Sequence, residues 1–546
     1  MKEDTAKLLI EIIAKALADL KPHELSAKDI LLDIPANSRF GDLTTNIALR
    51  LSSSLKQPRL KTAAVAAESI KNHLADSALK DYIEEVKAEG AGFVNFYFNN
   101  KYFYECLKEV IEKGEDSLKP ACAEKKNILI EFVSANPTGP LSVAHARQAA
   151  VGDVLANILA FCGFKVKKEY YLNDVGNQIN TLSNSVSLRI KELAGEKIDF
   201  PEEHYQGEYI YEIAKSALEH KIKPEASGDF AVKYILDIIK KELSDFGVRF
   251  DFWYSQKELE KSKKIEKALE FLKKKDFIYE KEGASWFKST YFNDDKDRVV
   301  IKSDGSYTYL APDIAYHQDK YKRGFDLLIN IWGPDHHGYI NRLKAAVMAL
   351  GKEAETLSII IVQLASIFKA GKPLQMSTRK GQYITLREVL DEVGVDAARF
   401  FFLMRRTSSH LNFDLEIAKK QTPENPVYYV QYAHARISSI LRNSTIKVNR
   451  KGLDLTLLKE KEEIELIKKI LQFTYILDII SKTLDPYILT VYLQELAESF
   501  HRFYDRHRVL GEDRALSEVR LALIQATKTV ISQGLDLLGV SKPEKM

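Results

Sequence analysis

The sequence has little cysteine, no large excess of charge of either sign and no long apolar run. Its 546 residues contain three cysteines, Cys106, Cys122 and Cys162, and these form no CxxC pair. A disulfide framework and a cysteine-rich zinc site are therefore excluded, and a reducing compartment is expected. Lys and Arg total 80 against 77 Asp and Glu, a net charge of +3. This balance excludes a protein that coats nucleic acid with a uniformly basic surface, but it is compatible with a basic patch on one face.

No apolar stretch is long enough to span a bilayer. The first segment, MKEDTAKLLIEIIAKALADL, carries acidic residues where a signal peptide would be basic, and Glu11 and Lys15 interrupt its apolar residues. We therefore expect a cytoplasmic protein that contacts no membrane. The hydrophobic fraction of 45% and the charged fraction of 29% are typical of a globular protein. At roughly 150 residues per domain, the length corresponds to three or four domains.

Three regions of the chain differ in their pattern of apolar residues. Residues 1–115 combine an amphipathic helix with alternating stretches such as 92–100, which predicts a small α+β domain. In 116–388, apolar runs alternate with helical segments, which predicts an α/β domain with a parallel sheet of Rossmann type. The helical, charged stretch at about 176–283 is predicted as an insertion between the halves of the sheet. Residues 389–546 show no convincing strand alternation, which predicts an all-α bundle.

Four runs are predicted as strands of this sheet, at residues 127–135, 165–174, 325–333 and 357–365. The first run leads through the turn-forming stretch NPTGPLS into a helix at 143–163. A strand that opens into a helix N-terminus is a natural anion site, because unpaired N–H groups and the helix dipole favour phosphate. His145 at the helix start can donate a hydrogen bond to a phosphate oxygen during its transfer. The alternative is that the loop only shapes a turn and that His145 caps or packs.

A second candidate is the polar loop GKPLQMSTRKGQYITL, which follows the last buried strand. It places Lys372, Arg379 and Lys380 around Ser377. A flexible basic loop at this edge of a parallel sheet can close over a triphosphate and neutralise the charge that moves to a leaving pyrophosphate. The alternative is an ordinary solvated loop.

These residues carry a resemblance to a known family. GPLSVAHARQAAVGD is similar to the HIGH signature of class I aminoacyl-tRNA synthetases, and QMSTRKG is similar to their KMSKS loop. Further blocks resemble arginyl-tRNA synthetases in the same order: EFVSANPTGPLSVAHARQAAVGD, YTYLAPDIAYH, IWGPDHHGYINRLKAA, NPVYYVQYAHARISSILR and LLGVSKPEKM. Two stretches, NSRFGDLTTNIALRL and GAGFVNFYF, resemble the N-terminal domain of that family. The resemblance therefore covers nearly the whole chain.

The resemblance implies ATP-dependent ligation of L-arginine to the 3′ end of its tRNA through an arginyl-adenylate. It implies tRNA, L-arginine and ATP as partners and Mg²⁺ accompanying the ATP. We expect no zinc and no metal held by the protein itself. We also expect a monomer, although the sequence does not fix the oligomeric state. Two other interpretations stay open. One is another class I synthetase, although three scattered cysteines do not supply the zinc ligands of a cysteinyl enzyme. The other is a catalytically silent tRNA-binding paralogue, which departures at Ser142 and Gln375 motivate.

The resemblance assigns an arginine pocket residue by residue. The positions that bind the guanidinium match Glu131, Tyr309 and Asp313, and paired carboxylates suit a planar guanidinium. Tyr309 and Asp313 are four residues apart, so one helical turn would put them on the same face. Asn136 matches the position that holds the α-amino group, and His337 is assigned to the same substrate. Taken without the family, Glu131 suits a salt bridge and Tyr309 suits a buried aromatic.

The resemblance assigns the nucleotide to the two signatures and to the GPDHHGY block. The departures are Ser142 and Ala144 in the first signature, and Gln375, Thr378 and Arg379 in the second. Which basic residue reaches the pyrophosphate, and which His of the block faces a ligand, stays open, and a metal site at that block is the alternative. The assigned catalytic residues are His145, Ser142, Ser377, Arg379 and Lys380. The residues assigned to ATP are Pro137, Gly139, Ala144, His145, Gly333, Asp335, His336, Gln375 and Met376.

Contacts with tRNA are expected from two domains. The segments NPVYYVQYAHARISSILR and HRFYDRHR mix aromatic residues, which can stack on unpaired bases, with arginines that reach phosphates. The alternative is a Tyr-rich helix core with a solvated charged face. By resemblance, 389–546 is the anticodon-binding domain, and 1–115 contacts the outer corner of the tRNA. The residues assigned to tRNA are Tyr428, Gln431, Tyr432, Arg436, Arg502, Arg39, Phe40 and Asn46.

Overall fold

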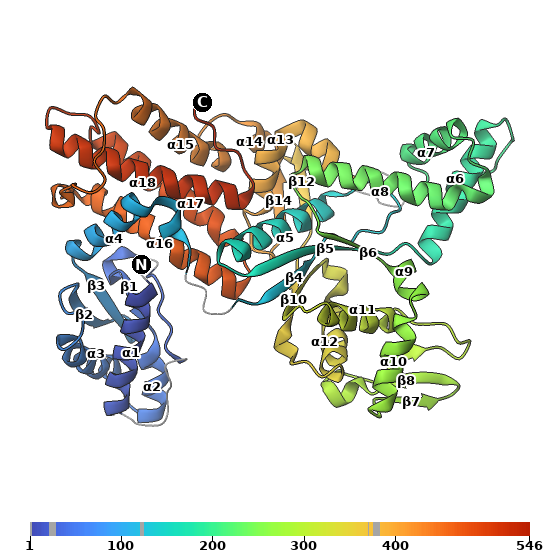
Figure 1. The fold of residues 1–546 in the computed structure, drawn as a ribbon, viewed down its shortest axis with the longest axis horizontal. Helices are drawn as coiled ribbons and strands as arrows, with labels where there is room; N and C mark the ends of the chain where they lie inside the picture. The colour runs from blue at the N-terminus through green and yellow to red at the C-terminus, as the bar shows by residue number, and fades with distance from the viewer. Residues whose placement is uncertain (1–2, 21–28, 36, 121–124, 370, 375–382) are drawn as a thin grey trace.

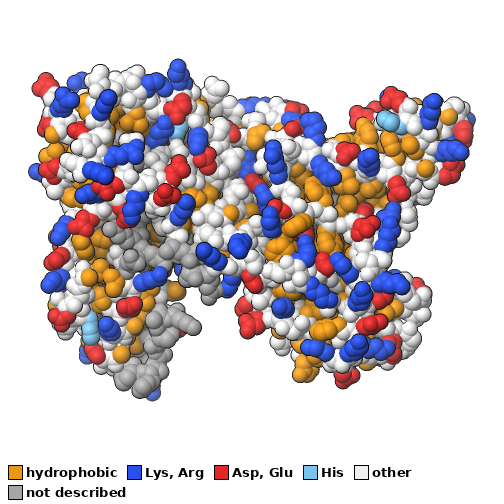
Figure 2. Space-filling view, in the orientation of Figure 1, with side chains coloured by type: hydrophobic (Ala, Val, Ile, Leu, Met, Phe, Trp, Pro, Cys, Tyr) orange, Lys and Arg blue, Asp and Glu red, His pale blue; other side chains and the backbone are white. Residues whose placement is uncertain are grey.

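The computed structural model describes residues 3–20, 29–35, 37–120, 125–369, 371–374 and 383–546. Within these ranges no helix has the length and apolar character needed to cross a membrane. Lys, Arg, Asp and Glu side chains are interspersed over the face shown in Figure 2, which has no large area of one sign. Any nucleic-acid contact on this face is therefore local.

The N-terminal region is the small α+β domain that its sequence predicts (Figure 1). Its antiparallel sheet has the order β1-β3-β2. The elements are α1 (Glu3–Leu20), β1 (Leu43–Thr45), α2 (Ile47–Leu55), α3 (Arg59–Ala75), β2 (Ile83–Glu89), β3 (Phe93–Phe98) and α4 (Asn100–Lys113). The domain is fixed to the C-terminal bundle, because Tyr104 donates a 2.6 Å hydrogen bond to the carbonyl of Leu458 and Lys468 forms a 2.6 Å ion pair with Asp42.

A five-stranded parallel sheet forms the centre of the molecule and confirms the predicted Rossmann type. Its order is β11-β10-β4-β5-β6. The strands are β4 (Asn127–Glu131), β5 (Lys165–Leu172), β6 (Phe252–Ser255), β10 (Leu327–Trp332) and β11 (Leu357–Ile361). From β4 the chain proceeds outward to β6 and then restarts on the other side of β4 with β10. Ligands of such sheets bind at the carboxyl ends of the strands beside this reversal, here between β4 and β10.

Helices and two small sheets surround the central sheet. Before β6 come α5 (Val143–Phe161), α6 (Asn177–Leu193), α7 (Glu208–Glu219) and α8 (Ser227–Asp245). After it come α9 (Gln256–Lys261), α10 (Lys264–Lys274), β7 (Ile278–Lys281), β8 (Ala284–Phe287), β9 (Arg298–Ile301), α11 (Leu310–Lys322) and α12 (Ile340–Ala349). Then follow β12 (Ala365–Lys369), β13 (Lys372–Pro373), α13 (Leu386–Phe402), β14 (Leu411–Asp414) and α14 (Leu415–Lys419). The C-terminal bundle consists of α15 (Pro426–Asn443), α16 (Lys461–Thr483), α17 (Tyr487–Arg506) and α18 (Arg514–Leu538).

Two strands correct the predicted organisation. β6 lies inside 176–283, which the sequence predicts as a helical insertion, yet it pairs in parallel with β5 at the edge of the main sheet. The helices before β6 and the β7-β8-β9 sheet after it are therefore two separate additions to the core. β14 lies beyond residue 389, where no strand is predicted, and it pairs in parallel with β12. Each of these strands has four residues, too few to show a periodic pattern in the sequence.

A buried arginine joins three regions of the chain. Arg399 on α13 is 0% exposed, and its guanidinium donates hydrogen bonds to the carbonyls of Leu538, at 2.7 Å, and Phe246, at 2.9 Å. It also forms a 2.6 Å ion pair with Asp153 on α5, whose other oxygen binds Lys168 at 2.9 Å. The end of the C-terminal helix, the end of α8 and the helix that follows β4 thus share one buried cation.

Candidate active site

A cavity of about 1140 Å³ opens at the carboxyl ends of β4 and β10. Its wall brings together residues from β4, the following loop, α5, α11 and the 3-10 helix after β10. The predicted site residues that line it are Glu131, Asn136, His145, Tyr309, Asp313, Gly333, Asp335 and His336. Segments nearly 200 residues apart in the chain therefore meet where the fold places a ligand, as the sequence predicts.

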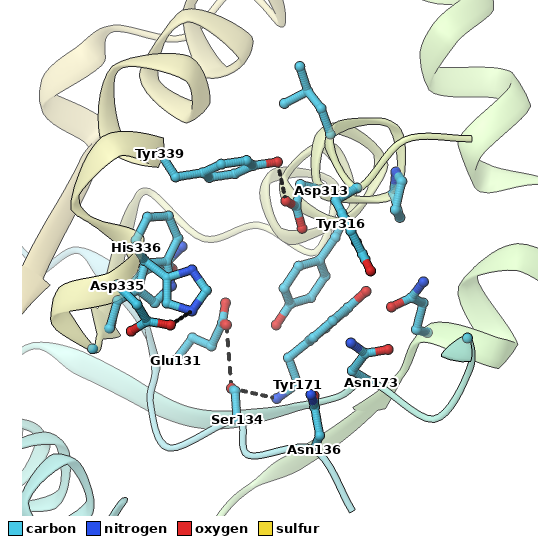
Figure 3. A pocket seen from close by; sticks show the side chains of 18 of the residues that line it. Glu131, Ser134, Asn136, Tyr171, Asn173, Asp313, Tyr316, Asp335, His336 and Tyr339 are labelled. Carbon is cyan, nitrogen blue, oxygen red and sulfur yellow. Dashed lines mark hydrogen bonds and ion pairs between the residues drawn. The ribbon is translucent and has the colours of Figure 1, made fainter. Parts of the chain in front are cut away.

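Strand β4 ends at Glu131 instead of continuing to residue 135 as predicted. The chain turns there because Val133 and Ser134 have positive φ angles of 66° and 42°. Positive φ is rare for a β-branched residue and costs about 1–3 kcal/mol. The turn directs Ser134 back toward the strand, where its hydroxyl lies 3.4 Å from Glu131 Oε1 and accepts a 3.1 Å hydrogen bond from the amide of Tyr171 (Figure 3).

Glu131 is 6% exposed and carries a buried ion pair. Its Oε2 binds the ammonium group of Lys320 on α11, and this ammonium also donates a 3.1 Å hydrogen bond to Asn330 Oδ1. The salt bridge that the sequence leaves open as an alternative therefore exists, but it involves one carboxylate oxygen. Glu131 still lines the cavity, so its position is compatible with both the ion pair and a ligand.

Tyr309 and Asp313 occupy the start of α11, one turn apart, as the sequence predicts. Tyr309 is 80% exposed and lines the cavity, so it is not the buried aromatic of the alternative interpretation. Asp313 Oδ2 accepts a 2.6 Å hydrogen bond from the hydroxyl of Tyr339 (Figure 3). Burial raises the pKa of Asp313 to about 7, and the nearby charge of Glu131 adds to this effect. The pocket thus contains a carboxyl group that a bound cation would ionise.

His145 stands in the first turn of α5, beside the predicted anion site. Burial lowers its pKa to about 4, so the imidazole is neutral near pH 7. Its Nδ1 accepts a 3.2 Å hydrogen bond from the amide of Ser142 and lies 3.2 Å from the Ser142 hydroxyl. Because Nδ1 is the acceptor, the proton of the neutral ring resides on Nε2, which is left as a donor.

The loop between β4 and α5 is held by residues from outside it. Tyr209 and Tyr383 donate hydrogen bonds to the carbonyls of Thr138, at 2.9 Å, and Pro140, at 3.0 Å. A Cβ atom on Gly139 would lie 3.2 Å from both tyrosine hydroxyls, which explains a glycine there. The predicted residues of this region that do not line the cavity are Pro137, Gly139, Ser142 and Ala144.

The second predicted signature falls on residues that the structure does not describe. This applies to Gln375, Met376, Ser377, Arg379 and Lys380. The chain resumes beside the first signature, since the amide of Leu386 donates a 2.7 Å hydrogen bond to the carbonyl of Leu141. The end of one signature segment is therefore fixed to the start of the other.

The GPDHHGY block forms a 3-10 helix, Pro334–Tyr339. His336 lines the cavity, its ring lies 5.6 Å from that of Trp332, and its Nε2 lies 3.4 Å from an oxygen of Asp335 (Figure 3). His337 is exposed and is not part of the cavity wall, so the structure places only the first of the two histidines there. Among the described residues, no group of three or more His, Cys, Asp or Glu gathers as a metal site would.

Sequence reasoning missed several residues that hold the predicted ones. Lys320 follows Asp313 by seven residues, which is two helical turns along the same face. This spacing indicates that Lys320 lies on the side of the helix that carries Asp313. Ser134 and Tyr339 gave no such signal, because their contacts depend on a positive-φ turn and on the path of a 3-10 helix.

The predicted tRNA surface on the bundle contains an aromatic cluster. Tyr428 and Tyr432 stack with ring centroids 6.1 Å apart, and His501 from α17 stacks on Tyr432 at 5.7 Å. The Arg436 guanidinium lies over Tyr432 at 5.0 Å and over Tyr504 at 4.8 Å. Aromatic faces and an arginine are thus arranged on two adjacent helices.

The remaining predicted tRNA residues have different environments. Gln431 is buried and donates hydrogen bonds to Asp396, at 2.8 Å, and to the Ser541 carbonyl, at 2.9 Å, so this amide group is used inside the protein. Arg502 is exposed and forms a 2.8 Å ion pair with Glu498.

On the N-terminal domain, the exposed Arg39 lies 4.5 Å above the Phe40 ring. Asn46 at the start of α2 is half-buried, and its Oδ1 has no hydrogen-bond partner. These three predicted residues belong to one segment, between the 3-10 helix at Ser38–Phe40 and α2.

Three family models match successive parts of the chain. Residues 7–98 match the arginyl tRNA synthetase N terminal domain, and residues 107–412 match the catalytic domain of class I (R) tRNA synthetases. Residues 430–546 match the DALR anticodon binding domain.

Individual proteins match over 82% of the chain or more. The arginine–tRNA ligase of Citrifermentans bemidjiense is 45% identical, with 100% of both chains covered. A solved structure from Campylobacter jejuni, described as an arginyl-tRNA synthetase, is 36% identical with a TM-score of 0.76, covering 82% of this chain and 100% of that one. The arginyl-tRNA synthetase structure from Thermus thermophilus has a TM-score of 0.78 at 22% identity, covering 99% and 100%, and shows the shared fold.

Proposed function

The chain belongs to the arginyl-tRNA synthetase family, and from that premise we propose how its residues divide the work of the reaction. The enzyme ligates L-arginine to its tRNA. In the first step the arginine carboxylate attacks the α-phosphorus of ATP, a P–O bond forms, and pyrophosphate leaves. In the second, a ribose hydroxyl of the tRNA attacks the acyl carbon and AMP leaves. Both steps depend on positioning and on stabilising charge that moves between oxygens.

The arginine side chain binds between Glu131 and Asp313. Two carboxylates from different elements, at the end of β4 and the start of α11, match the separated N–H groups of a guanidinium. Tyr309 also lines the cavity and is assigned to the same side chain. Asn136 receives the α-amino group with its Oδ1, and a 2.7 Å hydrogen bond from its Nδ2 to Gln178 orients it. His337 has no part in this proposal, because it lies off the cavity wall.

ATP binds beside the start of α5. His145 presents a neutral Nε2–H donor to the phosphates, and Ser142 acts through His145 by fixing its tautomer. Gly333, Asp335 and His336 line the same cavity and are assigned to the nucleotide. Mg²⁺ that accompanies the ATP would supply positive charge to the leaving pyrophosphate. The cavity, at about 1140 Å³, is large enough for both small substrates.

The chain divides after residue 115, which is supported by the separate sheets of the first two regions. The second boundary, predicted at 388, moves beyond β14, because this strand pairs in parallel with β12 of the catalytic region, and the helices after β14 form the third domain. The aromatic cluster with Arg436 is assigned to unpaired anticodon bases, and the segment with Arg39, Phe40 and Asn46 to the outer corner of the tRNA.

The enzyme acts as a monomer in the cytoplasm. A single chain supplies every group assigned to the small substrates, and the three cysteines do not require an oxidising compartment. Light scattering of the purified protein at working concentration tests the monomer: the expected mass is 62.2 kDa, and twice that mass would reject it.

The observation that carries the proposal is the convergence of Glu131, Asp313 and Tyr309 on one cavity with His145. It also speaks against a catalytically silent paralogue, which has no reason to keep the pocket together. The test is ATP–pyrophosphate exchange with tRNA present, using each amino acid in turn. Exchange with arginine alone is expected. Exchange with another amino acid, or tRNA binding without any exchange, would contradict the proposal.

A further inference from the structure

Lys320 carries a buried charge directly beneath the proposed arginine pocket. Its side chain is 0% exposed, and its ammonium group binds Glu131 Oε2 and Asn330 Oδ1. The ammonium also lies 4.2 Å from the centre of the Tyr316 ring, which favours a cation. A buried lysine is costly unless its charge is balanced and its donors are used, and here both conditions are met.

The same lysine is connected to both residues that supply the carboxylates of the pocket. The amide of Asn330 lies 2.9 Å from His317 Nε2, and His317 Nδ1 lies 2.8 Å from the carbonyl of Asp313. Lys320 thus touches Glu131 directly and reaches the backbone of Asp313 through two side chains. This network joins β4, β10 and α11, the three elements at the carboxyl edge of the sheet.

The carboxylates of Glu131 and Asp313 explain why a cation is stable at the position of the Lys320 ammonium. Glu131 and Asp313 face one cavity, and the charge of Glu131 disfavours ionisation of Asp313. Arg342 also faces Asp313, whereas Lys320 is the cation bound to Glu131. Without Lys320 the buried Glu131 carboxylate would lose this ion pair.

We propose that Lys320 is a positioning residue that sets the arginine specificity of the pocket, by holding Oε2 of Glu131 and leaving Oε1 to the substrate guanidinium. The inference rests on the proposed function, in which Glu131 binds the substrate. Because one oxygen of Glu131 is taken, a ligand must reach the other oxygen and Asp313 at the same time. The N–H groups of a guanidinium are spread over three nitrogens and can do so, whereas the three N–H groups of a lysine ammonium all leave one nitrogen and span a shorter distance.

The test compares equilibrium binding of arginine and of lysine to the folded enzyme, by calorimetry, without tRNA. Lys320→Met keeps an unbranched apolar stem that is one atom shorter and removes the charge. We expect its dissociation constant for arginine to rise about tenfold or more, with a smaller change for lysine, so that discrimination falls. The matched control is Lys322→Met, because Lys322 lies on the same helix but is exposed, and its ammonium donates a hydrogen bond to Gln318. This control should leave both constants unchanged.

A pH series separates positioning from a merely structural role. The groups that face Asp313 are Glu131, Lys320, Tyr339, Arg342 and Tyr171. Lys320 favours the ionised form of Asp313. Arginine affinity increases with pH, and in Lys320→Met the midpoint of this increase should lie about one pH unit higher. A purely structural lysine would lower the unfolding temperature and leave that midpoint in place.

A double variant keeps the test decisive if the single variant Lys320→Met does not fold. The double variant Glu131→Gln with Lys320→Met removes both charges of the pair, which avoids an unpaired buried carboxylate. If Lys320 acts through Glu131, the double variant should bind arginine within about threefold of Glu131→Gln alone. A further tenfold loss in the double variant would overturn the proposal.

The outcomes distinguish this inference from the proposed function. If the unmodified enzyme binds no arginine, both are overturned. If it binds arginine and folded Lys320→Met binds it equally well, with the same pH midpoint and the same discrimination against lysine, only the role of Lys320 is overturned.

Discussion

At the scale of single residues, the proposed arginine pocket contains a carboxyl group whose ionisation a bound guanidinium would favour. Asp313 has a pKa of about 7 because it is buried near Glu131. A guanidinium placed beside it would favour the charged form, so binding and ionisation reinforce each other. His145 has the opposite character: its pKa near 4 keeps it a neutral donor throughout the physiological range.

Asp313→Asn tests this group directly. The substitution keeps the shape of the side chain and the contact with Tyr339 but removes the charge. We expect the KM for arginine to rise about 10- to 100-fold, since one charge-assisted hydrogen bond is weakened, while the KM for ATP changes little. Steady-state exchange kinetics measure both values. The control is Asp304→Asn in an exposed turn, and an unchanged arginine KM for Asp313→Asn would place the pocket elsewhere.

The pH dependence of arginine binding follows from the same carboxyl group. In the free enzyme Asp313 is mostly protonated below pH 7, and the bound guanidinium lowers its pKa, so binding releases a proton. Affinity should therefore increase as pH rises through about 7 and become constant above it, with at most a tenfold change per unit below. Calorimetry in two buffers of different ionisation enthalpy measures the released proton. Affinity that falls between pH 6 and 8 would contradict this assignment.

The sequence could predict which residues meet but not how they are held. Glu131, Asp313 and His145 belong to blocks that resemble one family, and each block also has a recognisable place in a Rossmann-type unit. The partner of Glu131 is 189 positions away, at Lys320, and no local pattern reports such a pair. The choice between adjacent histidines depends on the path of a 3-10 helix, which the sequence does not specify.

At the scale of elements, the contact between α5 and the end of β4 places the pocket. Gly152 on α5 lies against the Phe132 ring, and a Cβ atom there would be 2.3 Å from that ring. Phe132 immediately precedes the positive-φ turn at Val133 and follows Glu131. The close approach of helix and strand therefore determines where Glu131 stands.

Gly152→Ala tests this approach. The added methyl group should force Phe132 to move, which costs about 1–3 kcal/mol of folding free energy and raises the KM for arginine because Glu131 moves with it. Thermal unfolding and exchange kinetics measure the two effects. Gly511→Ala is the control, since a Cβ atom there has no neighbour within 4 Å. Equal stability and kinetics for the two variants would refute the tight contact.

Elements were predicted best where they are long. The helix at 143–163 and the strands around residues 165 and 327 have enough residues to display a pattern. β6 and β14 have four residues each, and they are strands because neighbouring strands offer hydrogen bonds. The predicted strand at 127–135 was too long because its apolar run continues through Val133, where tertiary contacts override β-propensity.

At the scale of the whole molecule, the catalytic sheet and the C-terminal bundle are joined through buried polar contacts. Arg399 links α5, α8 and α18, and Asn157 on α5 donates a second hydrogen bond, of 3.2 Å, to the carbonyl of Leu537. The helix that carries His145 is therefore fixed against the end of the proposed anticodon-binding domain.

Arg399→Met tests the junction. It leaves Asp153 with Lys168 as its remaining charged partner and removes donors from two buried carbonyls. Breaking a buried pair of this kind costs about 3–5 kcal/mol, so the first unfolding transition should move to much lower temperature. Scanning calorimetry measures it. Arg405→Met serves as the control, because Arg405 is exposed. A transition temperature like that of the control would show that the junction does not stabilise the molecule.

The central claim is that one cavity at the end of β4 and the start of α11 recognises the arginine side chain. A crystal structure of the enzyme with bound L-arginine measures this directly. The account predicts the guanidinium within hydrogen-bond distance of Glu131 Oε1 and of the Asp313 carboxylate, with Lys320 still bound to Glu131 Oε2. An arginine side chain that points to solvent, or that binds away from these two carboxylates, would contradict it.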